Sequence, residues 1–157
     1  MNDWVAKRAD ERKRRQESKR IIERGGEDLW KNLCQSVLAA TQQYAQLFPE
    51  EREPYESIRT RPVDGSSEIW IEVLGKQPGA VSLMQPISKR NVKVSLDRGK
   101  WTITGKYSDK RDGVELTIMA GSDETACFQL DGKTIDLERA TEALLGPLLF
   151  PEMSPDK

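Results

Sequence analysis

The residues best suited to chemistry lie near the start of the chain, in the stretch KRADERKRRQESKR at positions 7–20. This stretch holds eight basic residues and no large apolar one. In an α-helix, four of the cations fall on one face, at spacings of 4, 3 and 4 residues: Arg8, Arg12, Arg15 and Lys19. A row of cations of this kind can neutralise successive phosphates. The pattern therefore predicts a contact with nucleic acid or with another acidic surface.

Two other hypotheses compete for the same segment. Residues 1–24 carry nine basic and five acidic side chains, and the acids cancel part of the attraction for phosphate. Large apolar residues stand only at the two ends, where they predict contact with a protein partner or a second copy of the chain: Trp4 and Val5, then Ile21 and Ile22. A coiled coil is excluded because no apolar heptad runs between the ends. The third interpretation is a solvated helix without any activity.

Trp70 is a further candidate for partner contact. It lies in EIWIEVL at positions 68–74, where apolar residues alternate with Glu68, Trp70 and Glu72. In a strand with one buried face, Trp70 therefore points away from the core. It either packs under a second layer or lies on the open face, where an aromatic ring can anchor a contact.

The composition argues against most kinds of catalytic and metal-binding site. The chain has no histidine, which excludes every histidine-based triad and removes the commonest transition-metal ligand. Cys34 and Cys127 form no Cys-x-x-Cys pair, and both fit as small buried hydrophobes. The stretch DGKT at 131–134 fits a tight hairpin turn better than a phosphate-binding loop. We therefore predict a non-enzymatic protein without catalytic, cofactor-binding or metal-binding residues.

The basic stretch must be positioned by a helix that has nothing to bury. Residues 3–24 contain no Gly or Pro, and acid–base pairs at i,i+4, such as Asp10 with Arg14, favour a long polar helix. Gly25-Gly26 is predicted to end or hinge it. An amphipathic helix over 26–48 then carries one wide apolar stripe, which must pack on a core.

From Glu68 onward the apolar residues alternate instead. Turn dipeptides such as Asp131-Gly132 separate the alternating segments, which predicts an antiparallel β-meander of about five to six strands, one of them near Ser57–Thr60. A C-terminal helix, capped at Asp136 and stopped or kinked by Gly146-Pro147, is predicted to pack on the sheet. The predicted class is α+β. The predicted core comprises Trp30, Leu33, Val37, Ile69, Ile71, Val92, Val94, Trp101, Ile103, Leu116, Ile118, Phe128, Leu137 and Leu144.

Charge and length divide the chain into a basic charged helical arm at 1–25, a single α+β domain at 26–150 and a flexible tail at 151–157. Residues 1–24 sum to +4, from nine basic and five acidic residues, and residues 25–157 sum to −5, from sixteen and twenty-one. No run is apolar enough for a membrane helix or a secretory signal, so we expect a cytoplasmic location and no membrane partner.

These features predict a small cytoplasmic accessory protein that works through protein–protein contact or self-association of its N-terminal helix. Two alternatives stay open: binding of nucleic acid or an acidic surface through that helix, and binding of a small ligand between the sheet and the C-terminal helix. Protein contact is favoured because the body is acidic and shows no nucleic-acid reading motif.

Overall fold

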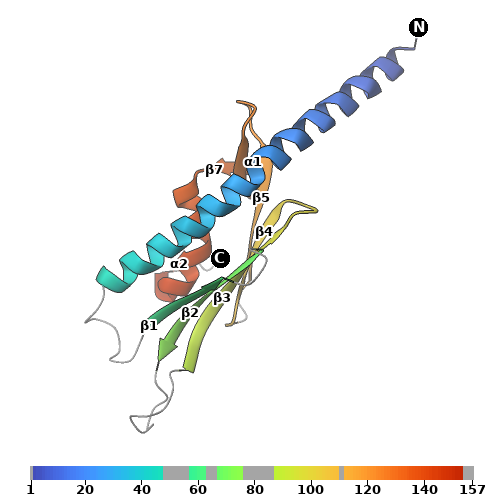
Figure 1. Ribbon diagram of the computed structural model, residues 1–157. Helices are drawn as coiled ribbons and strands as arrows, with labels where there is room; N and C mark the ends of the chain where they lie inside the picture. Colours follow the sequence, from blue (N-terminus) through green and yellow to red (C-terminus); the bar gives the residue numbers. More distant parts are fainter. Residues whose placement is uncertain (1, 48–56, 63–66, 76–86, 110–111, 154–157) are drawn as a thin grey trace.

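The computed structural model describes residues 2–47, 57–62, 67–75, 87–109 and 112–153, and it has the predicted α+β arrangement (Figure 1). A long N-terminal helix is followed by an antiparallel sheet and a C-terminal helix. The helices are α1 (Asp3–Leu47), α2 (Leu137–Leu149) and the short 3₁₀ helix η1 (Pro151–Met153). The strands are β1 (Ser57–Pro62), β2 (Glu68–Gly75), β3 (Ile87–Asp97), β4 (Thr102–Tyr107), β5 (Val114–Ala120), β6 (Ala126–Leu130) and β7 (Lys133–Ile135).

The seven strands within the described ranges form one antiparallel meander, in which each strand pairs with the next along the chain. The extended piece predicted near Ser57–Thr60 is the start of β1. The additional strand is β7, whose three residues are too few for alternation to be read. It pairs with β6 through the turn Asp131-Gly132, where both φ angles are positive, 51° and 80°. An Asp-Gly hairpin turn favours this geometry.

Both α-helices lie on one face of the sheet, and the core fills the space between the two layers (Figure 1). Alternation brings most of the apolar side chains described in β2 to β6 to this face. Every predicted core residue is buried except Trp101 and Leu137. Trp101 is half-buried because it belongs to the turn before β4 rather than to the strand. Leu137 is 37% exposed because it is the first residue of α2.

The prediction that Gly25-Gly26 ends or hinges the first helix is wrong. A single helix, α1, runs through both glycines and joins the two predicted helices, while residue 48 of the second lies outside the described ranges. Each glycine costs a helix interior about 1 kcal/mol relative to alanine. The helix keeps them because it passes very close to the sheet here. A Cβ on Gly26 would lie 2.6 Å from a ring carbon of Trp101, and one on Gly25 would lie 2.9 Å from the Cβ of Ala126.

The C-terminal helix begins as predicted but ends later. The carboxylate of Asp136 accepts a hydrogen bond from the backbone N–H of Arg139 at 2.8 Å, which confirms the predicted cap. The prediction that Gly146-Pro147 stops the helix is wrong, because α2 continues to Leu149. The predicted tail begins with η1, and its residues 154–157 lie outside the described ranges.

Pro147 fits inside α2 because the sheet supplies donors to the nearby carbonyls. Proline has no N–H for the carbonyl four residues earlier, that of Ala143. The hydroxyl of Tyr107, in β4, donates to the carbonyls of Leu144 at 2.6 Å and Ala143 at 3.4 Å. One turn later, the Nε of Arg90 donates to the carbonyl of Leu148 at 2.8 Å. These bonds hold the end of α2 against the sheet.

Candidate interaction site

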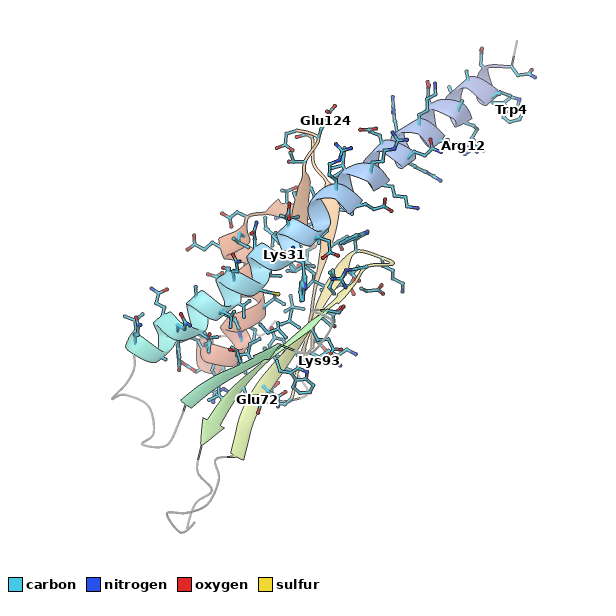
Figure 2. All side chains as sticks on the ribbon, in the orientation of Figure 1. Trp4, Arg12, Lys31, Glu72, Lys93 and Glu124 are labelled. Atoms are coloured by element: carbon cyan, nitrogen blue, oxygen red, sulfur yellow. The ribbon has the colours of Figure 1, made fainter. Side chains whose placement is uncertain are left out.

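The arm, defined here as residues 3–20 of α1, projects beyond the sheet (Figures 1 and 2). Every residue of the arm is exposed. Trp4, near its tip, is 66% exposed and Val5 is 48% exposed. Large apolar side chains are more often buried. The arm therefore adds nothing to the core, and it exposes an aromatic side chain to solvent.

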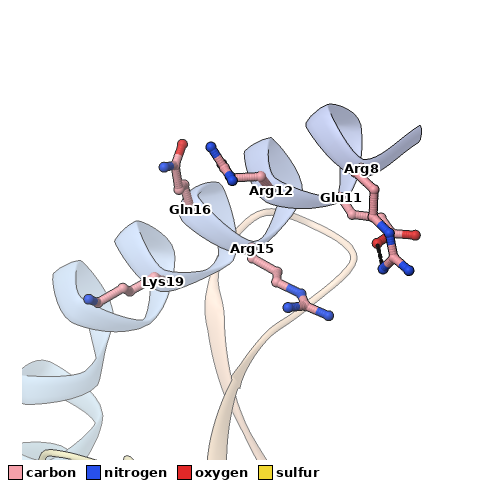
Figure 3. Close-up of a pocket in the computed structure, with 6 residues that line it drawn as sticks. All are labelled: Arg8, Glu11, Arg12, Arg15, Gln16 and Lys19. Atoms are coloured by element: carbon pink, nitrogen blue, oxygen red, sulfur yellow. Dashed lines mark hydrogen bonds and ion pairs between the residues drawn. The ribbon is translucent and has the colours of Figure 1, made fainter. Parts of the chain in front are cut away.

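Four cations form what we call the cationic face of the arm. At about 100° per residue, their positions fall within an arc of about 60° around the helix axis. They line a shallow depression of about 330 Å³ together with Glu11 and Gln16 (Figure 3). The four are the residues predicted from spacing: Arg8, Arg12, Arg15 and Lys19. The structure thus brings together the predicted phosphate-contact residues on one surface.

The acids of α1 neutralise part of this face. Arg8 donates to the carboxylate of Glu11 at 3.3 Å, and the ammonium group of Lys19 lies 3.9 Å from the carboxylate of Glu23. Within the part of the chain that the structure describes, Arg12 and Arg15 make no ion pair. Figure 3 shows these two side chains pointing to different sides of the helix axis, so the face is broad and open.

Trp4 belongs to the same surface as the cations. It precedes Arg8 by four residues, so one helical face holds both. Sequence reasoning placed Trp4 and the cations in separate hypotheses, although the spacing of four was visible. The continuous helix joins the aromatic tip and the cationic face into one candidate contact surface.

The other predicted contact residues of the first helix, Ile21 and Ile22, lie where the arm meets the body. Both are half-buried, and Ile22 packs against the core. Ile22 lies within about 20° of the arc of the cationic face. Further along the helix the same arc is its buried side, made of Gly26, Trp30, Leu33 and Val37. One face of α1 therefore changes from cationic to apolar near Ile22.

The turn before β4 helps to position α1 near Gly26, just after the arm. The ring of Trp101 lies against Gly26, and Trp101 has a positive φ of 52°. For an L-residue this left-handed conformation costs about 1–2 kcal/mol. The carbonyl of Trp101 accepts the backbone N–H of Ile118, in β5, at 2.9 Å. The ring is thus held by the sheet, and it sets how closely α1 approaches.

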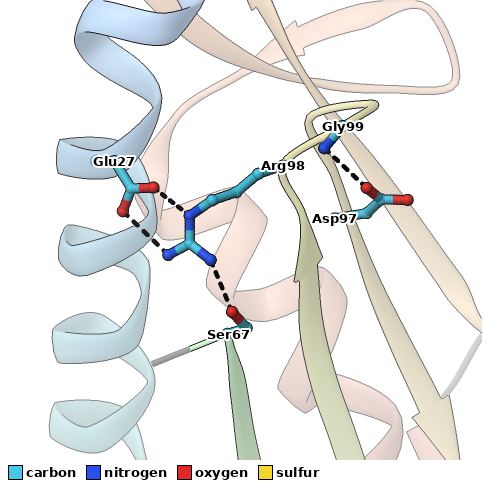
Figure 4. Close-up of polar contacts among 5 residues, drawn as sticks. All are labelled: Glu27, Ser67, Asp97, Arg98 and Gly99. Carbon is cyan, nitrogen blue, oxygen red and sulfur yellow. Dashed lines mark hydrogen bonds and ion pairs between the residues drawn. The ribbon is translucent and has the colours of Figure 1, made fainter. Parts of the chain in front are cut away.

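A charged cluster holds the same part of α1 to the turn between β3 and β4. The guanidinium group of Arg98 donates twice to the carboxylate of Glu27, once at 3.2 Å, and once to the hydroxyl of Ser67 at 2.6 Å (Figure 4). Asp97 accepts the backbone N–H of Gly99 at 2.9 Å, which shapes the turn that carries Arg98. The hydrogen bonds from Arg98 lower the pKa of Glu27. A charged, bidentate contact therefore helps to fix the direction of the arm.

Trp70 lies apart from the arm. As its parity predicts, it points to the sheet face opposite the buried one, where it is half-buried. The ammonium group of Lys93, on the neighbouring strand, lies 5.8 Å from the centre of the indole ring and 3.2 Å from the carboxylate of Glu68. Lys93 thus covers part of the ring through a cation–π contact. The structure does not bring Trp70 together with Trp4 or Ile22.

A groove of about 850 Å³ lies between the C-terminal half of α1 and α2. We call it the helix groove. Its lining includes the apolar side chains of Tyr44, Leu145 and Phe150, and the rings of Tyr44 and Phe150 meet edge to face at 5.4 Å. Three carboxylates also line it, those of Asp136, Glu138 and Glu142, and its lining residues in the described chain include no Lys or Arg. The concavity therefore lies between the helices, whereas we predicted a ligand site between the sheet and α2.

The described residues contain no group of three or more side chains that could hold a metal ion. Cys34 and Cys127 are half-buried and form no disulfide. Burial raises the pKa of Cys34 to about 11, so its thiol stays protonated near neutral pH. Among the described helices, none has the length and apolar character needed to cross a membrane.

Comparison with protein families, with curated proteins and with solved structures finds no match to this chain.

Proposed function

We propose that this chain is a non-enzymatic accessory protein that contacts a partner protein through its arm. The observation that carries the proposal is the state of residues 3–20, which are helical and all exposed yet continuous with a helix seated in the core. A segment that buries no apolar surface contributes little to the stability of the fold. Its projection from the body offers a partner an extended surface.

The arm can keep its helical form because the body begins the helix for it. A polar segment of about 18 residues is only marginally helical alone, since the first turn is costly to nucleate. Packing of residues 22–47 removes that cost, so the arm needs only propagation. Its many Ala, Arg, Lys and Glu residues favour propagation. A partner that binds the arm therefore has little chain to order.

The chemistry of the arm indicates the surface that it would contact. Tryptophan and arginine are the residues that most often dominate protein interfaces. The arm places Trp4 beside the cationic face and carries eight basic against four acidic residues. We therefore propose a partner protein with an apolar pocket bordered by carboxylates, because opposite charges favour both encounter and orientation.

Binding of a nucleic acid is the second candidate. The presence of four cations within one arc of α1 favours it, as does the lack of an ion pair for Arg12 and Arg15 in the described chain. The four acids of the arm and the excess of acidic residues in the body oppose it. Protein contact is the stronger proposal because it also uses Trp4.

Affinity capture with the full chain tests the proposal. We expect a specific partner protein to be retained by the wild type and lost from the double variant Arg12→Glu/Arg15→Glu. The matched control is Lys13→Glu/Arg20→Glu, which makes the same change of charge on another face of the arm and should retain the partner. A variant lacking residues 1–20 should lose the partner but keep its melting temperature within a few degrees. Equal capture by all four proteins would refute a role for the arm.

A mobility-shift titration separates the two candidates. If the arm bound a nucleic acid, affinity would fall with salt at a logarithmic slope of about 0.9 per duplex phosphate neutralised. It would also fall in both charge-reversal variants, because phosphate attraction depends on total charge. We expect no shift with DNA or RNA at low salt. A salt-dependent shift that is lost on removing residues 1–20 would favour the nucleic-acid function instead.

A further inference from the structure

We propose that the helix groove binds the arm of a second copy of this chain. The inference rests on the proposed function, since it names the partner of the arm. It also assigns a function to the helix groove. The two surfaces are both parts of α1, one at each end of the same helix.

The chemistry of the two surfaces is complementary. The helix groove offers an apolar lining that includes the edge-to-face pair of Tyr44 and Phe150, with carboxylates along the α2 side. The arm offers Trp4 for the apolar lining and the cationic face for the carboxylates. Glu142 also forms an ion pair with Arg139 at 2.7 Å, but both side chains are exposed, and the lining itself includes three carboxylates and, in the described chain, no basic side chain. An approaching cationic helix is therefore attracted to the α2 side of the helix groove.

The dimensions of the two surfaces also agree. At about 1.5 Å per residue, the α1 side of the helix groove, from Ser36 to Leu47, is about 17 Å long. The segment from Trp4 to Arg15 spans the same number of residues and the same length. An arm docked by Trp4 therefore places Arg8 and Arg12 beside the acidic side of the helix groove.

The arm cannot reach the helix groove of its own chain. Trp4 and Tyr44 are separated by 40 residues of one uninterrupted helix, or about 60 Å. The contacts of Gly26, Glu27 and Trp30 hold that helix against the sheet. Docking is therefore intermolecular. It joins two different surfaces, so it gives either a reciprocal dimer or a head-to-tail chain.

Sedimentation of the full chain tests the inference. The wild type should associate as its concentration rises, and the association should weaken between about 0.1 M and 1 M salt, where screening shortens from about 10 Å to 3 Å. Trp4→Ala should weaken it about tenfold or more, as expected for a tryptophan anchor. Arg12→Glu/Arg15→Glu and Glu138→Lys/Glu142→Lys should each abolish it, because each places like charges together.

The decisive sample is a mixture of the two charge-reversed proteins. The acidic arm of one matches the basic groove of the other, so the mixture should recover a heavier species although each protein alone sediments as a monomer. Lys13→Glu/Arg20→Glu is the matched control and should associate like the wild type. Circular dichroism confirms that each variant is folded.

Failure of this inference differs from failure of the proposed function. A wild type that stays monomeric at every concentration would overturn arm-to-groove docking, as would association that ignores the groove variant. If affinity capture still found an arm-dependent partner of another kind, the proposed function would stand. Loss of both results would leave the arm as a solvated helix.

Discussion

The two halves of α1, the arm and the body half (residues 22–47), form one helix but differ in composition and burial. On the face that includes Trp30, Leu33 and Val37, the body half is apolar and buried. On the same arc, the arm carries Trp4 and the cationic face, all exposed. Continuity of the backbone therefore does not imply a shared role. The body half packs in the core, whereas every residue of the arm is exposed.

The difference lies in what each half does for the other. The body half supplies a nucleated helix and a fixed direction, through Trp101 and the contact between Glu27 and Arg98. The arm contributes no burial in return. This one-sided dependence supports the proposal that the arm contacts a partner outside the fold.

The largest expected effect compares the two tryptophans of this face. Trp30→Ala should lower the free energy of unfolding by about 3–5 kcal/mol, because Trp30 is only 2% exposed. Trp4→Ala should change it by less than about 0.5 kcal/mol, because Trp4 is 66% exposed. Urea unfolding followed by circular dichroism measures both. A loss above about 1 kcal/mol for Trp4→Ala would mean that the arm packs on the body in solution.

The next effect concerns the glycines where the two halves meet. Gly26→Ala should destabilise the protein by about 1–3 kcal/mol, since its Cβ would lie 2.6 Å from the ring of Trp101. That clash outweighs a gain in helix propensity of about 1 kcal/mol. Gly146→Ala, inside α2, is the control: nothing lies within 4 Å of its Cβ, so it should stabilise by about 0.5–1 kcal/mol. Stabilisation by both changes would show that the approach of α1 to Trp101 is not tight.

These glycines mark where sequence reasoning stops. Composition and spacing predicted the α+β class, nearly all of the core and the Asp136 cap, because those features depend on local periodicity. Judged from the sequence alone, Gly25-Gly26 favours a helix end. The close approach of Gly26 to Trp101 cannot be seen at that level, because it is a tertiary contact. The prediction that Gly146-Pro147 stops the helix is wrong for the same reason, because the hydroxyl of Tyr107 comes from a distant strand.

The candidate site divides in the same way. The cationic face was predictable, because it depends only on spacing along one helix. The helix groove was not, because it forms where α1 meets α2, which begins 90 residues after α1 ends. The cover of Trp70 by Lys93 likewise needs the register of two strands. A surface formed by a single helix or strand can be predicted from the sequence. A surface formed between elements can be predicted only when the fold is known.

The smallest expected effect concerns the contact that fixes the direction of the arm. Because Arg98 lowers the pKa of Glu27 in the folded state, the contact stabilises the protein at pH values above the ordinary glutamate pKa of about 4.3. This stabilisation is lost as the pH falls through the lowered pKa. Glu27→Gln should therefore lower stability near neutral pH by less than about 1 kcal/mol, since both side chains are partly exposed.

Melting curves between neutral pH and about pH 3 test this linkage. The melting temperatures of the wild type and Glu27→Gln should differ near neutral pH and converge on acidification. Glu23→Gln is the control, because its partner Lys19 lies 3.9 Å away in the exposed arm. The melting temperature of this variant should follow that of the wild type at every pH. A constant gap at every pH would assign the effect of Glu27→Gln to packing, and the direction of the arm would then depend on Trp101 and Gly26 alone.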